Sequence, residues 1–380
     1  MTEKAGMSQR TIGRAQVMAY RWRAHQLDRP AGCADDAALL DFGVQDTGND
    51  GAAWALAVRG VRPSEASMLA WTLRGAPHRY RLADAKAVTV ATAPLSEADA
   101  ASRIFDSSRA LRAAGIAVLE ALTHVAGLTR RIVTGPMAKG AVSTALTAQL
   151  DRPYLRECRP CRAVHCGEMT FRLPALQAGL ALTPGTSPPV LRRITGVRPS
   201  PYARLGGDAD ERFHVVRNYL RFYGPATVPE AAKFLDAPVR DVQAAWPSDA
   251  VPVTLDDDGP RVRRHVLATD LDALTAADVT TGVARLVGPY DAYLQGRDRS
   301  VLVPDTTRHK ALWPVLGRPG AVLVDGEVAG VWRPRSSGGK LSLRVELWTP
   351  LRPPARKSLS AEAERLATHR GCALSSVDVS

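Results

Sequence analysis

Hydrophobic residues recur at helical spacing near the start of the chain, with polar residues between them. Residues 11–27 have this spacing, with arginines on the opposite face, which predicts an amphipathic helix. The acidic residues at positions 35 and 36 can start a second helix at Ala37, and the Pro-Ser-Glu segment at residues 63–65 favours the first turn of a third helix. Residues 71–82 then alternate around a turn, as in a β-hairpin. Helices followed by a hairpin are the order of a winged helix.

The same order of helices and a hairpin returns twice along the chain. Residues 111–133 have the spacing of a long amphipathic helix and residues 139–150 that of a short one, and residues 154–173 have two extended arms around a polar tip. In a third copy, residues 227–246 are spaced as a helix, a tight turn and a second helix, with Thr227 as the cap. A repeated module of this kind makes DNA binding the first hypothesis.

The last hundred residues are patterned as short strands. Residues 300–304, 320–334 and 340–348 are apolar or alternating, and Asp325-Gly326 supplies a two-residue hairpin turn. Residues 184–201 are rich in Pro, Gly and Ser, which indicates a linker. The pattern therefore predicts an α+β protein of tandem winged helices with a β-rich C-terminal part. We expect a first winged helix with its hairpin in residues 1–105, a second in 106–183, a linker in 184–205, a third in 206–282 and a β-rich domain in 283–380.

The net charge points to an acidic partner. The chain has 50 Lys and Arg residues against 38 Asp and Glu, a net charge of +12 and a pI near 9.9. Most of the excess is arginine, which suits phosphates and base edges, so double-stranded DNA is the expected partner. The alternative is the arginine bias of a GC-rich genome.

Localisation follows from what the sequence lacks. The first ten residues have no apolar segment of a signal peptide, and no run of about 18 apolar residues is present to span a bilayer. Five cysteines fit a reducing compartment better than a disulfide framework. We therefore expect a cytoplasmic, nucleoid-associated protein.

Gln45 and Asp46 interrupt an apolar stretch and are candidate catalytic residues. Neither belongs inside a helix bundle without a partner. In the functional interpretation, the Gln45 amide holds a water molecule and a nearby carboxylate orients it for attack on an electrophilic carbon. In the alternative, both residues end one helix and cap the next, which begins near Ala52.

The first hairpin carries a dense group of cationic side chains. Arg74, His78, Arg79 and Arg81 surround Tyr80 and a Pro turn, which is typical of a basic finger that contacts phosphates and stacks on a base. The alternative is a charged wing that only keeps an edge strand soluble.

A second group of polar residues opens the C-terminal part. Asp291, Arg297, Asp298 and Arg299 lie close together in the sequence, beside Tyr290. They are equally consistent with a phosphate clamp and with a structural ion-pair network.

Cofactor signatures are scarce. Cys158, Cys161, His165 and Cys166 are soft ligands within nine positions, and Cys372 is the remaining candidate besides Cys33. The sequence leaves open whether they bind zinc or are incidental thiols at a wing tip. The glycine-rich nucleotide signatures are absent, so we expect no nucleotide cofactor and assign no metal ligand.

Five segments occur in one order: "GVQD" after a Leu-rich helix, "RGAPHRYRLAD", "LPALQAG", "GPYDAYLQGRDRSVLVPD" and "PGAVLVDGEVAGVWRPR". In this order they resemble the tandem winged-helix proteins of the AlkZ/YcaQ type, over about residues 10 to 350. The resemblance implies a C-shaped arrangement of winged helices that holds duplex DNA. It also implies a monofunctional DNA glycosylase that releases bulky N-alkylated or crosslinked purines, in DNA repair or in self-resistance to a genotoxin.

The resemblance also implies site residues. Gln45 would hold the attacking water near the anomeric carbon, with support from Asp46 and little need for acid catalysis. The family motif is Gln, an apolar residue, then Gln or Asp, and here Gly43 stands where the first Gln would be. The expected DNA contacts are Arg74, His78, Arg79, Arg81, Arg297 and Arg299.

Three hypotheses therefore compete. A monomeric DNA glycosylase leads. A transcriptional regulator or non-catalytic winged-helix DNA-binding protein would bind undamaged DNA by sequence, usually as a dimer. A winged-helix scaffold for protein partners would bind no DNA in a salt-dependent way.

Overall fold

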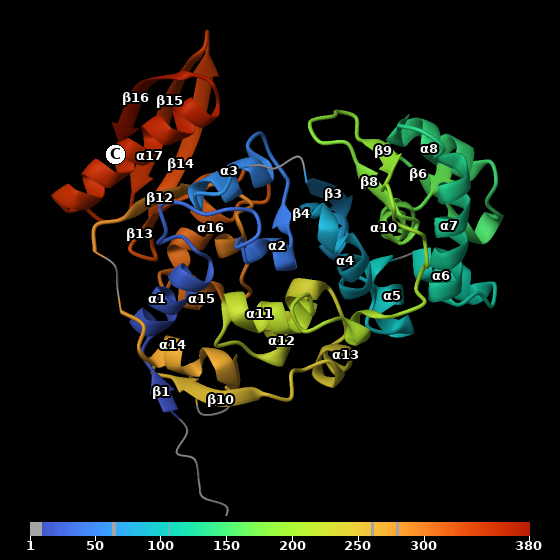
Figure 1. The fold of residues 1–380 in the computed structure, drawn as a ribbon, viewed down its shortest axis with the longest axis horizontal. Helices are drawn as coiled ribbons and strands as arrows, with labels where there is room; N and C mark the ends of the chain where they lie inside the picture. The colour runs from blue at the N-terminus through green and yellow to red at the C-terminus, as the bar shows by residue number, and fades with distance from the viewer. Residues whose placement is uncertain (1–9, 63–65, 106, 260–261, 279–280) are drawn as a thin grey trace, which may run out of the picture.

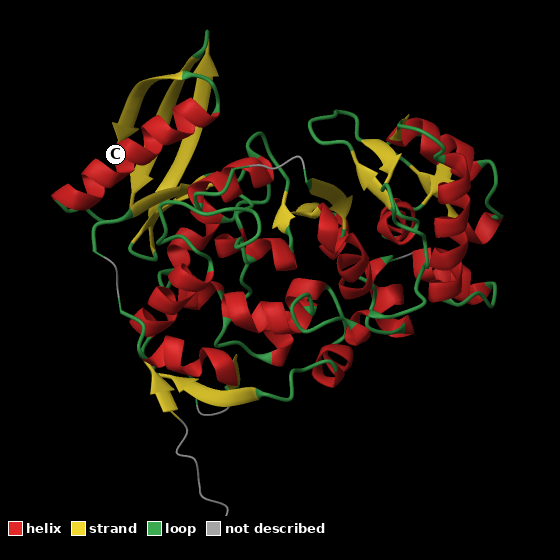
Figure 2. Cartoon of the chain, viewed as in Figure 1, coloured by secondary structure: helices red, strands yellow, loops and turns green. Residues whose placement is uncertain are grey.

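The computed structural model describes the chain except for residues 1–9, 63–65, 106, 260–261 and 279–280 (Figure 1). Helices and strands alternate along most of its length (Figure 2), which confirms the predicted α+β class. The β-rich C-terminal part and the helices of residues 107–147 lie at opposite ends of the long axis, and the helices of residues 215–235 lie between them (Figure 1).

The first winged-helix unit contributes side chains to several hydrophobic cores, including that of the C-terminal part. Its elements are α1 (Arg14–Ala24), α2 (Leu39–Phe42), β2 (Val44–Gln45), α3 (Gly51–Val58), β3 (Ser67–Trp71), β4 (Pro77–Arg81), α4 (Ala85–Ala91) and α5 (Glu97–Arg103). Trp22 of α1 and Trp54 of α3 pack into the core of the C-terminal sheet, and the Trp54 indole donates to the Leu286 carbonyl at 2.6 Å. The candidate motif at Gln45 therefore lies where the first unit docks on the C-terminal part.

The first hairpin is confirmed, with one correction. β3 and β4 pair antiparallel from Ser67 opposite Arg81 to Trp71 opposite Pro77. Residues 63–65, where a third helix was predicted to start, lie outside the described residues. The segment that follows them is strand β3, not a helix. Periodicity does not separate a short buried strand from a helix, and residues 68–71 are all buried.

The second unit contains α6 (Ser107–Ala113), α7 (Val118–Ile132), β5 (Met137–Ala138), α8 (Lys139–Thr147), β6 (Leu155–Cys158), β7 (Ala163–Cys166), α9 (Glu168–Arg172), α10 (Pro174–Gln177), β8 (Leu180–Leu182) and β9 (Val190–Arg193). The helix predicted over residues 111–133 is two helices, because Gly115 has a φ of +72° between them.

No single helix in the described part of the chain is long and apolar enough to cross a membrane; only α6 and α7 taken together pass that test, and they are bent by 106°.

The linker predicted over residues 184–201 contains a strand. β9 pairs with β8 and β5, and the sheet order β2-β4-β3-β8-β9-β5 joins the first two units. Leu191 of β9 is fully buried in this sheet. Pro and Gly on both sides of the strand gave the segment its linker-like composition.

The helix-turn-helix predicted over residues 227–246 is present in the third unit. This unit contains β1 (Arg10–Ile12), α11 (Val215–Tyr223), α12 (Val228–Leu235), α13 (Val239–Ala244), β10 (Ala250–Leu255), β11 (Arg264–Leu267) and α14 (Leu271–Thr275). Thr227 caps α12 in a capping box with Glu230, with each side chain accepting from the other residue's backbone N–H. β1 pairs parallel with β10, and α1 packs on α11 and α14, so the N-terminal elements complete this unit.

The C-terminal part is a five-stranded sheet covered by a long helix (Figure 1). Its elements are β12 (Ala284–Val287), α15 (Arg299–Leu302), α16 (His309–Leu312), β13 (Gly320–Val324), β14 (Glu327–Ser337), β15 (Lys340–Leu347), α17 (Pro353–His369) and β16 (Ala373–Val379). The hairpin at Asp325-Gly326 is confirmed. Residues 300–302, predicted as part of a strand, belong to helix α15 instead. Helix α17 and strand β16, which pairs in parallel with β15, were not among the predicted elements.

Candidate active site

Gln45 lies in β2, opposite His78 of β4. Val44 points into the core and is 1% exposed, so the strand turns the half-buried Gln45 side chain the other way. The Gln45 amide nitrogen donates to the Thr47 hydroxyl at 3.1 Å, and its carbonyl oxygen lies 3.5 Å from an Arg74 nitrogen. These contacts hold the amide at the end of the strand.

The Gln45 side chain lines a cavity of about 430 Å³ between the first unit and the C-terminal part. Ligand pockets commonly span roughly 300–1,000 Å³. On the far wall, the Arg318 guanidinium lies 5.3 Å from the ring centre of Tyr290. Arg333 and Arg370 also line the cavity, and Arg370 pairs with Asp50. The cavity therefore combines an amide, an aromatic ring and several guanidinium groups.

Asp46 has a structural role in this arrangement. One carboxylate oxygen accepts the backbone N–H of Ala52, in the first turn of α3, at 2.8 Å. The other oxygen accepts from Arg79 at 3.3 Å. The capping interpretation of this residue thus has direct geometric support, and the helix that Asp46 caps is the one that carries Trp54 into the C-terminal core.

Position 43 requires glycine for a steric reason. Its φ is +100°, and a Cβ atom placed there would lie 2.4 Å from the Tyr80 hydroxyl oxygen. That hydroxyl is 2.8 Å from the Thr72 hydroxyl, which lies 3.0 Å from Nδ1 of His78. Burial raises the pKa of Tyr80 and lowers the pKa of His78 to about 3. A buried neutral network therefore fills the space beside Gly43.

Most donors of the predicted basic finger are used inside the protein. His78 is 3% and Arg81 is 8% exposed. The Arg81 guanidinium pairs with Asp41 at 2.6 Å and also donates to the Ala37 carbonyl at 2.7 Å. These two side chains of β4 are therefore buried rather than projecting, so His78 and Arg81 are not exposed for DNA contact in this structure.

Arg74, Arg297 and Arg299 form a cationic cluster on aromatic rings. The Arg74 guanidinium stacks 4.3 Å above the ring centre of Phe234 in α12, and Arg297 approaches the same ring at 6.0 Å. Burial and the nearby Arg297 charge lower the pKa of Arg74. Arg299 stacks on Trp313 at 4.7 Å. Two guanidinium groups facing one ring leave positive charge that a phosphate would neutralise.

The second polar group divides into two roles. Asp291 forms a bidentate pair with Arg59 at 2.8 Å, and Asp298 pairs with Arg21 at 2.5 Å, all four side chains being almost fully buried. Among the described residues, neither Arg297 nor Arg299 forms an ion pair. The aspartates therefore anchor the C-terminal part to α1 and α3, and the two arginines stay open to a ligand. A cavity of about 450 Å³ contains both of these arginines and Lys233.

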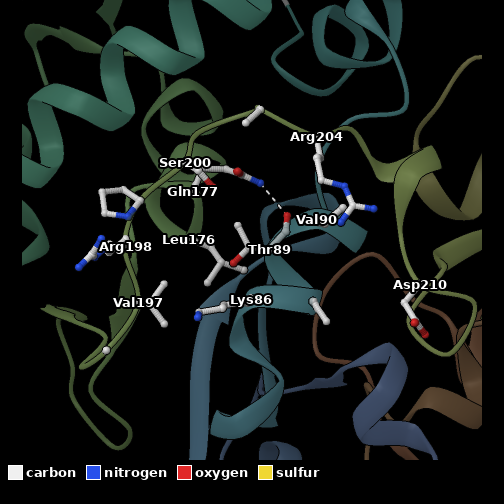
Figure 3. Close-up of a pocket in the computed structure, with 14 residues that line it drawn as sticks. Lys86, Thr89, Val90, Leu176, Gln177, Val197, Arg198, Ser200, Arg204 and Asp210 are labelled. Carbon is white, nitrogen blue, oxygen red and sulfur yellow. Dashed lines mark hydrogen bonds between the residues drawn. The ribbon is translucent and has the colours of Figure 1, made fainter.

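Another cavity, of about 620 Å³, lies between α4 and the segment after β9 (Figure 3). Lys86, Arg198 and Arg204 line it, and the Gln177 amide donates to the Thr89 carbonyl at 2.7 Å within it. None of the residues predicted for catalysis or DNA contact lies in this cavity. It therefore contributes nothing to the site assignment.

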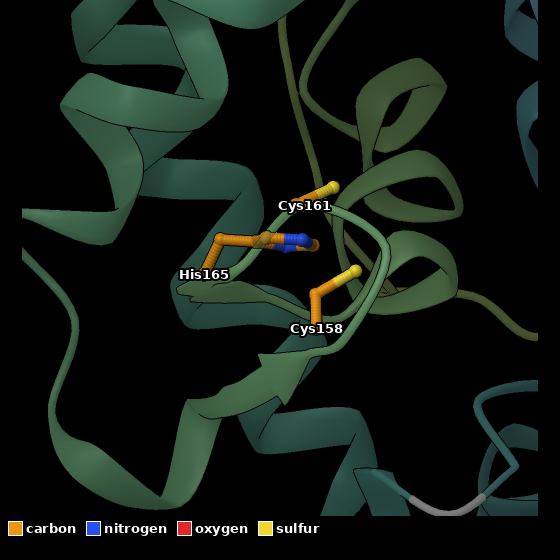
Figure 4. Close-up of side chains that lie close together, drawn as sticks. All are labelled: Cys158, Cys161 and His165. Carbon is orange, nitrogen blue, oxygen red and sulfur yellow. The ribbon is translucent and has the colours of Figure 1, made fainter.

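Three of the four candidate metal ligands are brought together. The side-chain donor atoms of Cys158, Cys161 and His165 lie within 4.8 Å of one another (Figure 4). Cys166 is 2% exposed and packs in the core of the second unit. Strand alternation explains the separation, since neighbouring residues in β7 face opposite sides.

Comparison with known proteins bears on the fold and the family. The family model described as DNA glycosylase AlkZ-like matches residues 63–369. The solved structure of the Streptomyces sahachiroi DNA glycosylase AlkZ is similar, with a TM-score of 0.71 and 20% identity over 97% of this chain and 100% of that one. No curated protein sequence matches the chain. The predicted winged-helix fold is confirmed. The range matched by the family model begins after Gln45, so a role for that residue has to be argued from its structural surroundings.

Proposed function

The chain belongs to the AlkZ-like family of DNA glycosylases, as the sequence resemblance predicted, and from that premise we propose that it releases bulky alkylated or crosslinked purines from duplex DNA. The observation that carries the proposal is the position of Gln45. Its amide lies at the wall of a cavity large enough for a base, between the two parts of the protein that the buried Arg59–Asp291 pair holds together.

The proposed reaction is hydrolysis of the N-glycosidic bond. A water molecule forms a bond to the anomeric carbon, the bond to the base nitrogen breaks, and the water loses a proton to solvent. An N-alkylated purine is cationic and leaves as a neutral base, so no protonation of the leaving group is needed. The enzyme then has to position the water and stabilise the positive charge that develops on the sugar.

Gln45 suits both tasks. Its carbonyl oxygen can accept a hydrogen bond from the water. The negative end of the amide dipole can also stabilise the positive charge that develops on the sugar. The contacts to Thr47 and Arg74 fix the orientation of the amide, which reduces the reorganisation needed during the reaction. Because both Asp46 oxygens have backbone or arginine partners, we assign Asp46 to holding the loop rather than to activating the water.

DNA binding is assigned to the exposed face around the cationic cluster. Arg74, Arg297 and Arg299 lie on aromatic rings with no carboxylate partner among the described residues, and each is half-buried. Such guanidinium groups can bind phosphates without breaking internal ion pairs. We propose that the protein acts as a monomer on damaged double-stranded DNA, in the cytoplasm at the nucleoid, with no nucleotide cofactor.

The test is base release from a defined duplex. The protein is incubated with DNA that carries one N7-alkylated guanine, and abasic sites are revealed by alkaline cleavage. Gln45→Ala should lower the single-turnover rate by roughly 10²-fold, a typical loss for a group that assists the attacking nucleophile. Asn49→Ala, an exposed residue on the rim of the same cavity, is the matched control and should keep the wild-type rate.

Two outcomes would contradict the proposal. Equal rates for Gln45→Ala and the wild type would remove the assigned role of the amide. Sequence-dependent binding to undamaged DNA, with no base release from any adduct, would favour the regulator hypothesis for this member of the family.

A further inference from the structure

The tip of the β6–β7 hairpin gathers three soft donors. Cys158 ends β6, Cys161 lies in the turn and His165 lies in β7. The turn can bring Cys161 back toward Cys158 because Arg162 adopts a left-handed conformation with a φ of +51°. All three donor atoms point into one small space outside the core (Figure 4).

Burial separates the fourth candidate from the other three. Cys166 is 2% exposed and packs in the core of the second unit, whereas Cys158 and His165 are half-buried and Cys161 is exposed. The structure therefore selects three ligands from the four that the sequence offered.

We propose that Cys158, Cys161 and His165 bind one zinc ion, with water in the fourth position. Two thiolates and an imidazole are the donor set that zinc prefers. With zinc–ligand bonds of about 2.0–2.3 Å, tetrahedral geometry separates the ligand atoms by roughly 3.8 Å. The observed separations of at most 4.8 Å reach that value by small side-chain rotations. Each cysteine that is still protonated releases its proton when the ion binds.

The ion would stiffen a basic tip. A two-stranded hairpin is only marginally stable alone, and β6 and β7 form a two-stranded sheet. Arg156, Arg159 and Arg162 are exposed on this hairpin. Two thiolates cancel the charge of the zinc ion, so the arginines keep their full positive charge toward a phosphate backbone. Only this last step depends on the proposed function; zinc binding itself does not.

Metal binding is tested on the full-length protein, stripped of metal and kept reduced. Cobalt is titrated first, because thiolate ligands give an intense charge-transfer absorption and tetrahedral cobalt gives visible bands. Zinc is then titrated in competition with a chromophoric chelator. We expect one ion per chain, displacement of cobalt by zinc, and weaker binding at pH 6 than at pH 8, since protons compete for the thiolates.

Substitutions place the ion. Cys158→Ser, Cys161→Ser and His165→Ala should each weaken zinc binding by at least about 100-fold and remove or shift the cobalt bands, the upper range for loss of a metal-site group. Cys33→Ser and Cys372→Ser, which change cysteines outside the cluster, are the matched controls and should bind as the wild type does. All five variants should keep the wild-type circular dichroism spectrum, since none of these side chains is fully buried.

Three results would overturn the proposal: no thiolate–cobalt absorption in the reduced protein, zinc binding that survives Cys158→Ser, or a Cys158–Cys161 disulfide that forms in place of metal binding when the reductant is removed in the presence of zinc. Glycosylase activity is not the readout. Failure here would therefore leave the assignment of Gln45 untouched, and failure of the Gln45 test would leave the zinc site untouched.

Discussion

Substitutions of Asp46 test whether its carboxylate is structural or catalytic. Asp46→Ala removes the acceptor for the Ala52 N–H at 2.8 Å and the partner of Arg79 at 3.3 Å. Loss of a capping side chain costs about 1 kcal/mol. The ion pair adds about 0.2–1 kcal/mol, since its side chains are 20% and 12% exposed and salt screens them. We therefore expect a loss of about 1–2 kcal/mol of stability.

Asp46→Asn distinguishes the two roles. The asparagine amide oxygen still accepts the Ala52 N–H, and only the charge and the Arg79 pair are lost. Stability should then fall by less than about 1 kcal/mol. If the carboxylate only supports the loop, the Asp46→Asn protein should release the base at close to the wild-type rate.

Thermal unfolding and single-turnover base release measure the two effects separately. A loss of 1 kcal/mol lowers the melting temperature by about 2–4 °C in a domain of about 150–250 residues, so activity is compared well below the lowest transition. A normally folded Asp46→Asn protein whose rate falls by 100-fold would refute the structural assignment and make the carboxylate part of the chemistry. An unchanged melting temperature for Asp46→Ala would refute the capping argument.

Two further predictions concern DNA binding and pH. Arg297→Ala and Arg299→Ala should each weaken binding to duplex DNA, and each should reduce the slope of log K against log salt by about 0.9, measured by fluorescence anisotropy between low and physiological salt. Arg344→Ala, at an exposed position of β15, is the matched control, and an equal loss there would show that the effect is not local. His78 has its pKa lowered to about 3 by burial, so the unfolded chain binds a proton that the folded protein does not. Stability should fall as the pH drops from about 6.5 toward 3, by up to about 1.4 kcal/mol per pH unit for this histidine. Melting temperatures of His78→Gln should fall less steeply with pH than those of the wild type, and parallel curves would contradict the assignment.

Features with partners only a few residues away were predictable. The Thr227–Glu230 capping box, the Asp325-Gly326 turn and the hairpin around Cys161 depend on contacts within short segments. The α3 helix after Gln45 was also expected. In contrast, residues 67–70 and 300–302 were assigned to the wrong type of element, because a short apolar run takes the conformation that its distant neighbours allow.

The sequence by itself determined the family, the α+β class, the repeated winged helices and the position of the glutamine. The tertiary structure alone decided which charged side chains are free. Arg81 and Asp291 form ion pairs with residues 40 and 232 positions away in the chain. Arg297 and Arg299 form no ion pair with any described residue. The same holds for the cavity at Gln45, whose walls come from both ends of the chain. Local hydrogen bonds can be predicted from neighbouring residues in the sequence, whereas burial and charge pairing depend on which surfaces the whole chain brings together.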